Sequence, residues 1–166
     1  ALLDSIQYGT QVRDYSIGRI PNGTGQWTLN TPTIGVLNHE AGLASDVNLH
    51  VNEWMANSSS GSDWFELFNS ATQPVDLSGL FLSDKLDLRN QFQIHPLSFI
   101  GTGADAFLKF DADSNPGAGA THTNFKLSTK GDSIGLFRAD GSVISSVTFG
   151  LQALDVSQGD LPDGSA

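Results

Sequence analysis

The chain has 166 residues, a length that fits one domain or one domain plus a piece of another. Hydrophobic residues make up 39% and charged residues 16%, which allows a core and excludes wholesale disorder. The absence of cysteine excludes disulfides and thiolate metal sites, and a net charge of −10 argues against nucleic acid as a partner. No apolar run reaches the roughly 18 residues of a membrane-spanning helix, so we expect no membrane insertion.

The first part of the chain shows little regular pattern. Residues 2–8 alternate enough to predict a strand. Residues 14–27 include Pro21 and the dipeptide Asn22-Gly23, which predict a loop with a tight turn. Residues 27–46 have little periodicity and predict an edge segment followed by a linker.

From residue 47 onward, apolar and polar residues alternate in short runs. In one of these runs, Phe65 and Leu67 fall on one face of the expected strand, whereas Glu66 falls on the other. Asp140-Gly141 between two alternating runs is a strong hairpin signal. The strands expected in this part are 47–55, 63–69, 77–84, 92–100, 106–112 and three within 125–150.

The spacing of these runs indicates the fold class. Short strands about ten residues apart, frequent turn residues and no amphipathic helix predict an all-β fold. We expect an immunoglobulin-like β-sandwich of about seven to nine strands, with a barrel as the alternative.

One pattern occurs twice, 141 residues apart. Residues 2–23 read LLDSIQYGTQVRDYSIGRIPNG, and residues 143–164 read VISSVTFGLQALDVSQGDLPDG. We call these segments the N-terminal copy and the C-terminal copy. A single sandwich has one position for its final strand and turn, so the two copies compete for it. The C-terminal copy follows the tight Asp140-Gly141 hairpin, so its closure costs less entropy and we expect it to pair beside residues 133–139.

Several segments together resemble the bacterial lamin tail domain, an immunoglobulin-like sandwich also found near the C-terminus of nuclear lamins. The segments are NEWMANSSSGSDWFELFN, VDLSGLFLSD, NFKLSTKGDSIGLFRADGSVISSVTFG and DVSQGDLPDG, and they cover about residues 47–166. The resemblance implies an immunoglobulin-like fold of the lamin tail type and no catalytic site. Two positions depart from the family pattern: Leu80 stands where a tryptophan is usual, and Asp160 stands where Arg19 keeps the usual arginine.

The resemblance also implies a division of the chain. The family's last segment continues into a tryptophan strand, as in PNGTGQWTLNTPTIG at 21–35. Residues 1–38 therefore resemble the end of a preceding repeat, residues 39–46 a linker, and residues 47–166 the next domain. We expect a piece of a longer bacterial protein that is secreted or in the cell envelope. Its expected partners are proteins, either neighbouring repeats of the same polypeptide or a second copy.

The N-terminal copy is displaced from the final strand position, so the whole segment 1–38 that contains it is expected to act elsewhere. It could add to the exposed edge of a second molecule, as donated strands do, or wrap round its own sandwich. The residues expected to carry such an exchange are Ile6, Tyr8 and Trp27. The expected function is therefore that of a non-enzymatic structural or protein-interaction module.

The segment DADSNPG resembles the start of a calcium loop, with oxygen ligands at Asp111, Asp113 and Asn115. An EF-hand requires glycine at the sixth position and a bidentate glutamate at the twelfth, where this chain has Pro116 and His122. A solvated loop is the better reading. We expect no cofactor and keep calcium as the alternative.

Trp54 and Trp64 lie on adjacent expected strands and invite comparison with sugar-binding aromatic surfaces. Cross-strand packing is the more usual role of such a pair. A carbohydrate-binding module attached to an extracellular hydrolase, with or without calcium, is the second hypothesis for function.

No residues form a convincing catalytic set. Glu53, Asp63 and Glu66 flank one turn and could pair as acid and base, but Glu66 falls on the face opposite Phe65 and is expected to be exposed. The histidines form no HxH or HExxH pattern. We therefore expect no enzymatic activity.

Overall fold

The computed structural model describes residues 1–165. Over this range it has thirteen strands and two short 3₁₀ helices, η1 (Asp46–Asn48) and η2 (Gly103–Asp105). No helix in the described range is long and apolar enough to cross a membrane.

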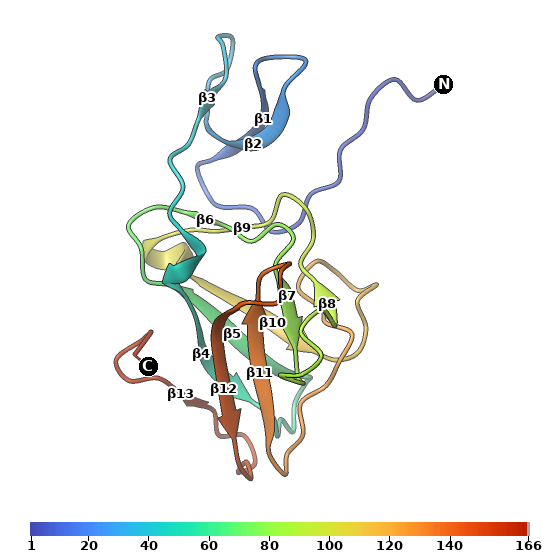
Figure 1. Cartoon of the computed structure of the whole chain (residues 1–166), viewed down its shortest axis with the longest axis vertical. Coiled ribbons are helices and arrows are strands. Elements are labelled where there is room, and N and C mark those ends of the chain that lie inside the picture. The colour runs from blue at the N-terminus through green and yellow to red at the C-terminus, as the bar shows by residue number, and fades with distance from the viewer. Residues whose placement is uncertain (166) are drawn as a thin grey trace.

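Two four-stranded antiparallel sheets form a sandwich, which occupies the lower part of Figure 1. The first sheet has the order β10 (Phe107–Ala112), β5 (Asp63–Asn69), β4 (Leu49–Met55) and β13 (Gln158–Gly159). The second has the order β12 (Val143–Phe149), β11 (Asp132–Phe137), β7 (Phe81–Ser83) and β8 (Phe92–Gln93). This arrangement confirms the expected all-β, immunoglobulin-like sandwich, and the sheets do not close into a barrel.

Alternation along the strands explains the core of the sandwich. On β5, Phe65 and Leu67 are fully buried, whereas Glu66 between them is only half-buried. Phe65 stacks on Phe110 of β10 and on Phe125, with ring centroids 5.5 and 6.1 Å apart. Successive strand residues point to opposite faces, so this one strand contributes a continuous apolar face to the core.

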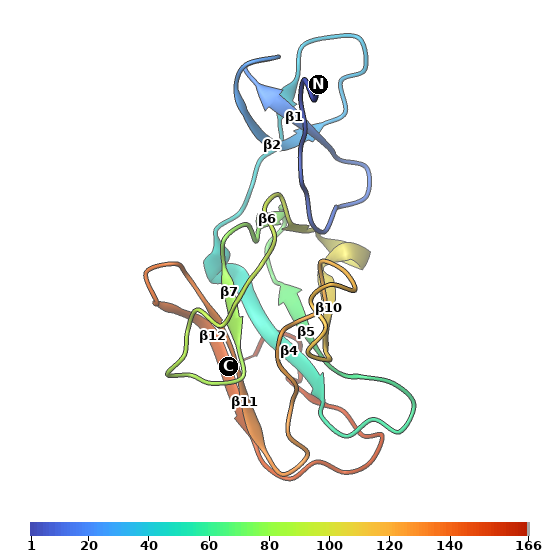
Figure 2. The same cartoon turned by 90° about the vertical axis from the view of Figure 1, so that its right-hand side faces the viewer.

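A third, smaller sheet lies at the other end of the molecule and contains β1 (Ser16–Ile20), β2 (Gln26–Thr31) and β3 (His39–Glu40) in that order. Both views show it beyond the end of the sandwich that carries the short pair β6 (Val75–Asp76) and β9 (Phe99–Ile100) (Figures 1 and 2). Its buried Leu29 belongs to an apolar cluster with Val12, Ala41 and Phe99.

Residues 9–13 attach the N-terminal copy to the sandwich beneath it. The amide of Gly9 donates to the carbonyl of Pro96 at 3.0 Å, and the amide of Phe99 donates to the carbonyl of Thr10 at 2.9 Å. A side chain at Gly9 would collide with Ser98, so glycine permits this close approach. In this chain the copy therefore rests on the end of its own sandwich.

The C-terminal copy fills the final strand position, as its local hairpin predicted. Its first part is β12, which pairs with β11, and its later part is β13, which pairs with β4. Two of the three strands expected within 125–150 form, β11 and β12, whereas residues 125–129 form only an isolated bridge at Lys126. Gly131, at a φ of 117°, makes the turn before β11, and Gly141, at 81°, makes the turn before β12.

Three predictions for the N-terminal part of the chain differ from the structure. Residues 2–8 form no strand, although the equivalent residues 143–149 are β12, because nothing equivalent to β11 lies beside them among the described residues. Residues 16–20, expected in a loop, form β1 because they pair with β2. The segment 39–46, expected as a linker, contains β3.

Candidate functional site

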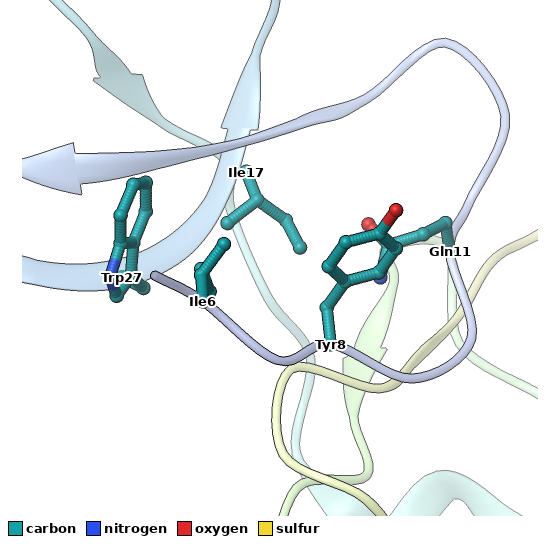
Figure 3. A pocket seen from close by; sticks show the side chains of 5 residues that line it. All are labelled: Ile6, Tyr8, Gln11, Ile17 and Trp27. Atoms are coloured by element: carbon teal, nitrogen blue, oxygen red, sulfur yellow. The ribbon is translucent and has the colours of Figure 1, made fainter. Parts of the chain in front are cut away.

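An apolar pocket of about 430 Å³ lies between residues 2–11 and the small sheet. Ile6, Tyr8, Gln11, Ile17 and Trp27 line it. Figure 3 shows Ile6 and Ile17 pointing toward one another, with Trp27 on one side and Tyr8 on the other. The structure thus brings together all three residues expected to carry strand exchange, although they come from separate segments.

The positive charge of Arg19 lies at the rim of the pocket, next to Trp27. The guanidinium of Arg19 lies 4.5 Å from the centre of the Trp27 ring and bonds to the Asp4 carboxylate at 3.2 Å. Cation–π contact and an ion pair together orient Arg19 on β1. The pocket itself remains apolar, with charge only at this margin.

The pairing of β1 leaves one of its edges open. The carbonyl of Leu29 on β2 accepts from Ala41 on the far side, so the pair Leu29–Ile17 exchanges no backbone hydrogen bonds. The bonds between β1 and β2 therefore fall at the neighbouring pairs, such as Gly18–Thr28. The backbone N–H of Ile17 points to the opposite edge, where no strand pairs within residues 1–165.

The C-terminal copy shows what occupies the equivalent edge and space in a complete sandwich. Gln158, the equivalent of Ile17, is directly opposite Trp54 of β4. The Trp54 indole stacks on Phe149, the equivalent of Tyr8, with centroids 5.6 Å apart. Phe149 is 7% exposed whereas Tyr8 is 60% exposed, so the pocket matches the space that Trp54 fills.

Local geometry agrees between the two copies. The Gln11 side chain donates to the carbonyl of Gly9, and the equivalent Gln152 donates to Gly150. Both copies place an aspartate in the left-handed region, with φ of 61° at Asp14 and 56° at Asp155. The two copies are therefore equivalent in backbone conformation at these positions as well as in sequence.

The sequence analysis did not name Gln11 and Ile17 as site residues. Periodicity could not find Gln11, because it lies outside any strand, and Ile17 lies on β1 in a stretch that its turn residues predicted to be a loop. The repeat could have found them, because Gln11 aligns with Gln152, which is buried.

In the structure, the carboxylates of the calcium candidates bond to other residues of the chain. Asp111 pairs with Lys109 at 2.8 Å, and Asp113 bonds to His122 at 2.6 Å and accepts from the amide of Asn115. Burial raises the pKa of Asp113, but the His122 and Asn115 hydrogen bonds outweigh it and hold the pKa below its usual value. No group of three His, Asp or Glu side chains in the described range is close enough to hold a metal ion, and calcium binding stays a prediction.

Trp54 and Trp64 do not share a surface. Trp54 is 6% exposed and belongs to the core. Trp64, half-buried, is next to Phe65 on β5 and therefore points to the outer face. The two indoles cannot form one stacking surface, and carbohydrate binding stays a prediction resting on Trp64 alone.

The three carboxylates considered for catalysis do not all lie on one face of the sheet. Glu53 and Glu66 are opposite each other across β4 and β5, whereas Asp63 lies an odd number of positions from Glu66. Burial raises the pKa of Glu66, the hydrogen bond from Asn52 opposes the rise, and the nearby charge of Glu53 adds to it.

Comparison with known proteins identifies the family. A sequence model of the lamin tail domain family matches residues 44–150, more than half of the chain. The comparisons found no match among curated proteins or among solved structures. This match covers the sandwich from just before η1 to the end of β12, and the observed immunoglobulin-like architecture is that of the family. The chain belongs to the lamin tail domain family.

Proposed function

We propose that this chain is a non-enzymatic structural module that associates with other lamin tail domains through its residues 1–38. The module would belong to a larger bacterial protein that is secreted or in the cell envelope. Lamin tail domains are protein-interaction modules of immunoglobulin-like fold, which supports a protein partner.

The open pocket at the N-terminal copy carries this proposal. A large aromatic side chain in a stable fold normally has most of its surface buried, yet Tyr8 is 60% exposed beside an open strand edge. Exposed apolar surface next to an unpaired edge is a common feature of protein-binding sites. The self-repulsion of a chain with net charge −10 opposes close approach, so we expect association to strengthen with added salt.

Light scattering on the full chain tests this proposal. A monomer has a mass of 17.6 kDa, and we expect the mean mass to rise above this value as protein concentration increases. Tyr8→Ser should shift the rise to higher concentration. Leu88→Ser is the matched control, because Leu88 is 45% exposed and lies on the loop between β7 and β8 rather than in the N-terminal copy. A mass of 17.6 kDa at every concentration and salt level would contradict self-association.

Carbohydrate binding remains the second candidate because Trp64 lies on the outer face of β5. An array of bacterial and plant glycans tests it directly. Binding that disappears in Trp64→Ala would favour this function over the first.

A further inference from the structure

We propose that the pocket and the open edge of β1 together receive a strand of the β4 type from another lamin tail sandwich, with an aromatic side chain entering the pocket. This inference rests on the proposed function and names the element that docks. The occupant is a strand of the β4 type with an aromatic residue at the position of Trp54. Because β4 of this chain is already paired with β5 and β13, the donor is a lamin tail sandwich that lacks its own final strand.

The backbone edge supports this choice of occupant. In the C-terminal copy, the amide of Asp160 donates to the carbonyl of Asn52 on β4 at 2.8 Å. Asp160 is equivalent to Arg19, whose N–H points to the same open edge as that of Ile17. The edge of β1 that no strand pairs is therefore the edge that the C-terminal copy uses to bind β4. The Asn38 side chain donates to the carbonyl of Arg19 at 3.0 Å on this edge, so the arriving strand replaces that one hydrogen bond.

The pocket supports an aromatic side chain as the inserted group. Trp54 lies opposite Gln158 and against Phe149, and the equivalents of these two residues, Ile17 and Tyr8, both line the pocket. Ile17 replaces a glutamine, which makes this space more apolar than in the C-terminal copy. A cavity of about 430 Å³ is also within the size range of small-ligand sites, so occupation by a small molecule is the competing outcome.

Charge favours the N-terminal copy as the binding element. In the C-terminal copy, Asp160 and Asp163 line a pocket with Glu53 of β4, which places three carboxylates near one another. The N-terminal copy has Arg19 and Asn22 at those two positions. An arginine near the one carboxylate of β4, Glu53, is attracted where an aspartate is repelled.

An extended form of the full chain tests the inference. A second copy of residues 44–142 is placed directly before Leu2, so that Leu2 follows the added Ser142 as Val143 follows Ser142 in the natural chain. The added segment has its own β4 but no C-terminal copy, and the short connection gives an effective concentration in the millimolar range. Hydrogen exchange of individual amides is then compared between the extended and the natural chain.

We expect the amides of Ile17 and Arg19 to exchange at least about tenfold more slowly in the extended chain. Gly18 is the internal control, because its pairing with Thr28 should protect it equally in both chains. Unchanged exchange at Ile17 and Arg19 would overturn the inference, whether or not the added segment folds. Protection of Tyr8 and Trp27 without protection of these two amides would indicate a different occupant of the pocket and would also overturn it.

A pair of substitutions separates the backbone edge from the side chain. Ile17→Pro removes the N–H that points to the open edge, and Ile17→Ala keeps it while shortening the side chain. In the extended chain, Ile17→Pro should abolish the protection of Arg19, and Ile17→Ala should reduce it less. Equal effects of the two substitutions would overturn strand pairing. If the natural chain still self-associates when these tests fail, only the assigned docking element is wrong and the proposed function stands.

Discussion

The two copies of the repeated segment share their local geometry and differ in almost everything around it. Both contain a left-handed aspartate and a glutamine bonded to the preceding glycine, yet residues 143–149 form a strand and residues 2–8 do not. Phe149 lies buried against Trp54, and its equivalent Tyr8 is largely exposed. Turns in this segment therefore form from local residues, whereas its strands form only beside a partner strand.

The largest expected difference between the copies is the loss of stability when their equivalent aromatic residues, Phe149 and Tyr8, are replaced. Phe149→Ala removes a buried ring that stacks on Trp54 and should lower the free energy of unfolding by about 3–5 kcal/mol. Tyr8→Ala should change it by about 0.5 kcal/mol or less, because the ring is exposed. Urea unfolding of the two variants measures both values. Equal losses would show that Tyr8 is already packed in the free chain.

A smaller difference in the free energy of unfolding is expected for Asn52 and Asn38, which bond to the turns at the ends of the two copies. Asn52 is buried, accepts from the amide of Gly164 at 2.9 Å and donates to Asp163. At the N-terminal copy, the amide of Asn38 donates to the Asn22 side chain at 3.0 Å, and the Asn38 side chain donates to the carbonyl of Arg19 at 3.0 Å. Asn52→Ala should cost about 1–3 kcal/mol, because buried polar groups lose their partner, and Asn38→Ala about 1 kcal/mol. Thermal unfolding of both variants ranks them, and a larger loss for Asn38→Ala would reverse the comparison.

The smallest expected effect on stability comes from the carboxylates near the C-terminal copy. Burial and the charges of Glu53 and Asp163 raise the pKa of Glu66 above its usual value of 4.5, against the opposing hydrogen bond from Asn52. A raised carboxyl pKa means that the folded state binds the proton more tightly. The contribution of Glu66 to stability is therefore greatest below pH 4.5 and is lost as pH rises through the folded pKa.

Asp163→Asn copies Asn22 of the N-terminal copy and removes one of these charges. It should raise the free energy of unfolding at pH 7 by about 0.5 kcal/mol or less, with a smaller gain at pH 4. Urea midpoints across this pH range measure the change. In a Glu66→Gln background the gain should shrink, and an undiminished gain would show that Glu66 is not the group affected.

Much of the sandwich was predictable because its strands are regular and half-buried. The alternation in 63–69 predicted both the bounds of β5 and its buried face, and Asp140-Gly141 predicted the hairpin between β11 and β12. The run 92–100 was predicted less well. It divides into the short strands β8 and β9, because the chain turns around Pro96 between them.

The candidate site was predictable only in part. The repeat drew attention to Ile6 and Tyr8, the segment that follows it drew attention to Trp27, and all three line the pocket. Ile17 escaped notice because its stretch contains turn-forming residues and was read as a loop. Its pairing with β2 across the turn at residues 21–25 depends on the small sheet as a whole.

The amino-acid sequence by itself determined the fold class, the position of the tight turns and the existence of two equivalent segments. These features depend on the alternation of side chains and on local backbone preferences. Neither requires contact with residues distant in the sequence. The hairpin at Asp140-Gly141 already predicted which copy occupies the final strand position. The tertiary structure alone decided that the other copy is left with an open edge and a pocket. That outcome depends on whether a partner strand is present, because a β-strand has no hydrogen-bond partners within itself.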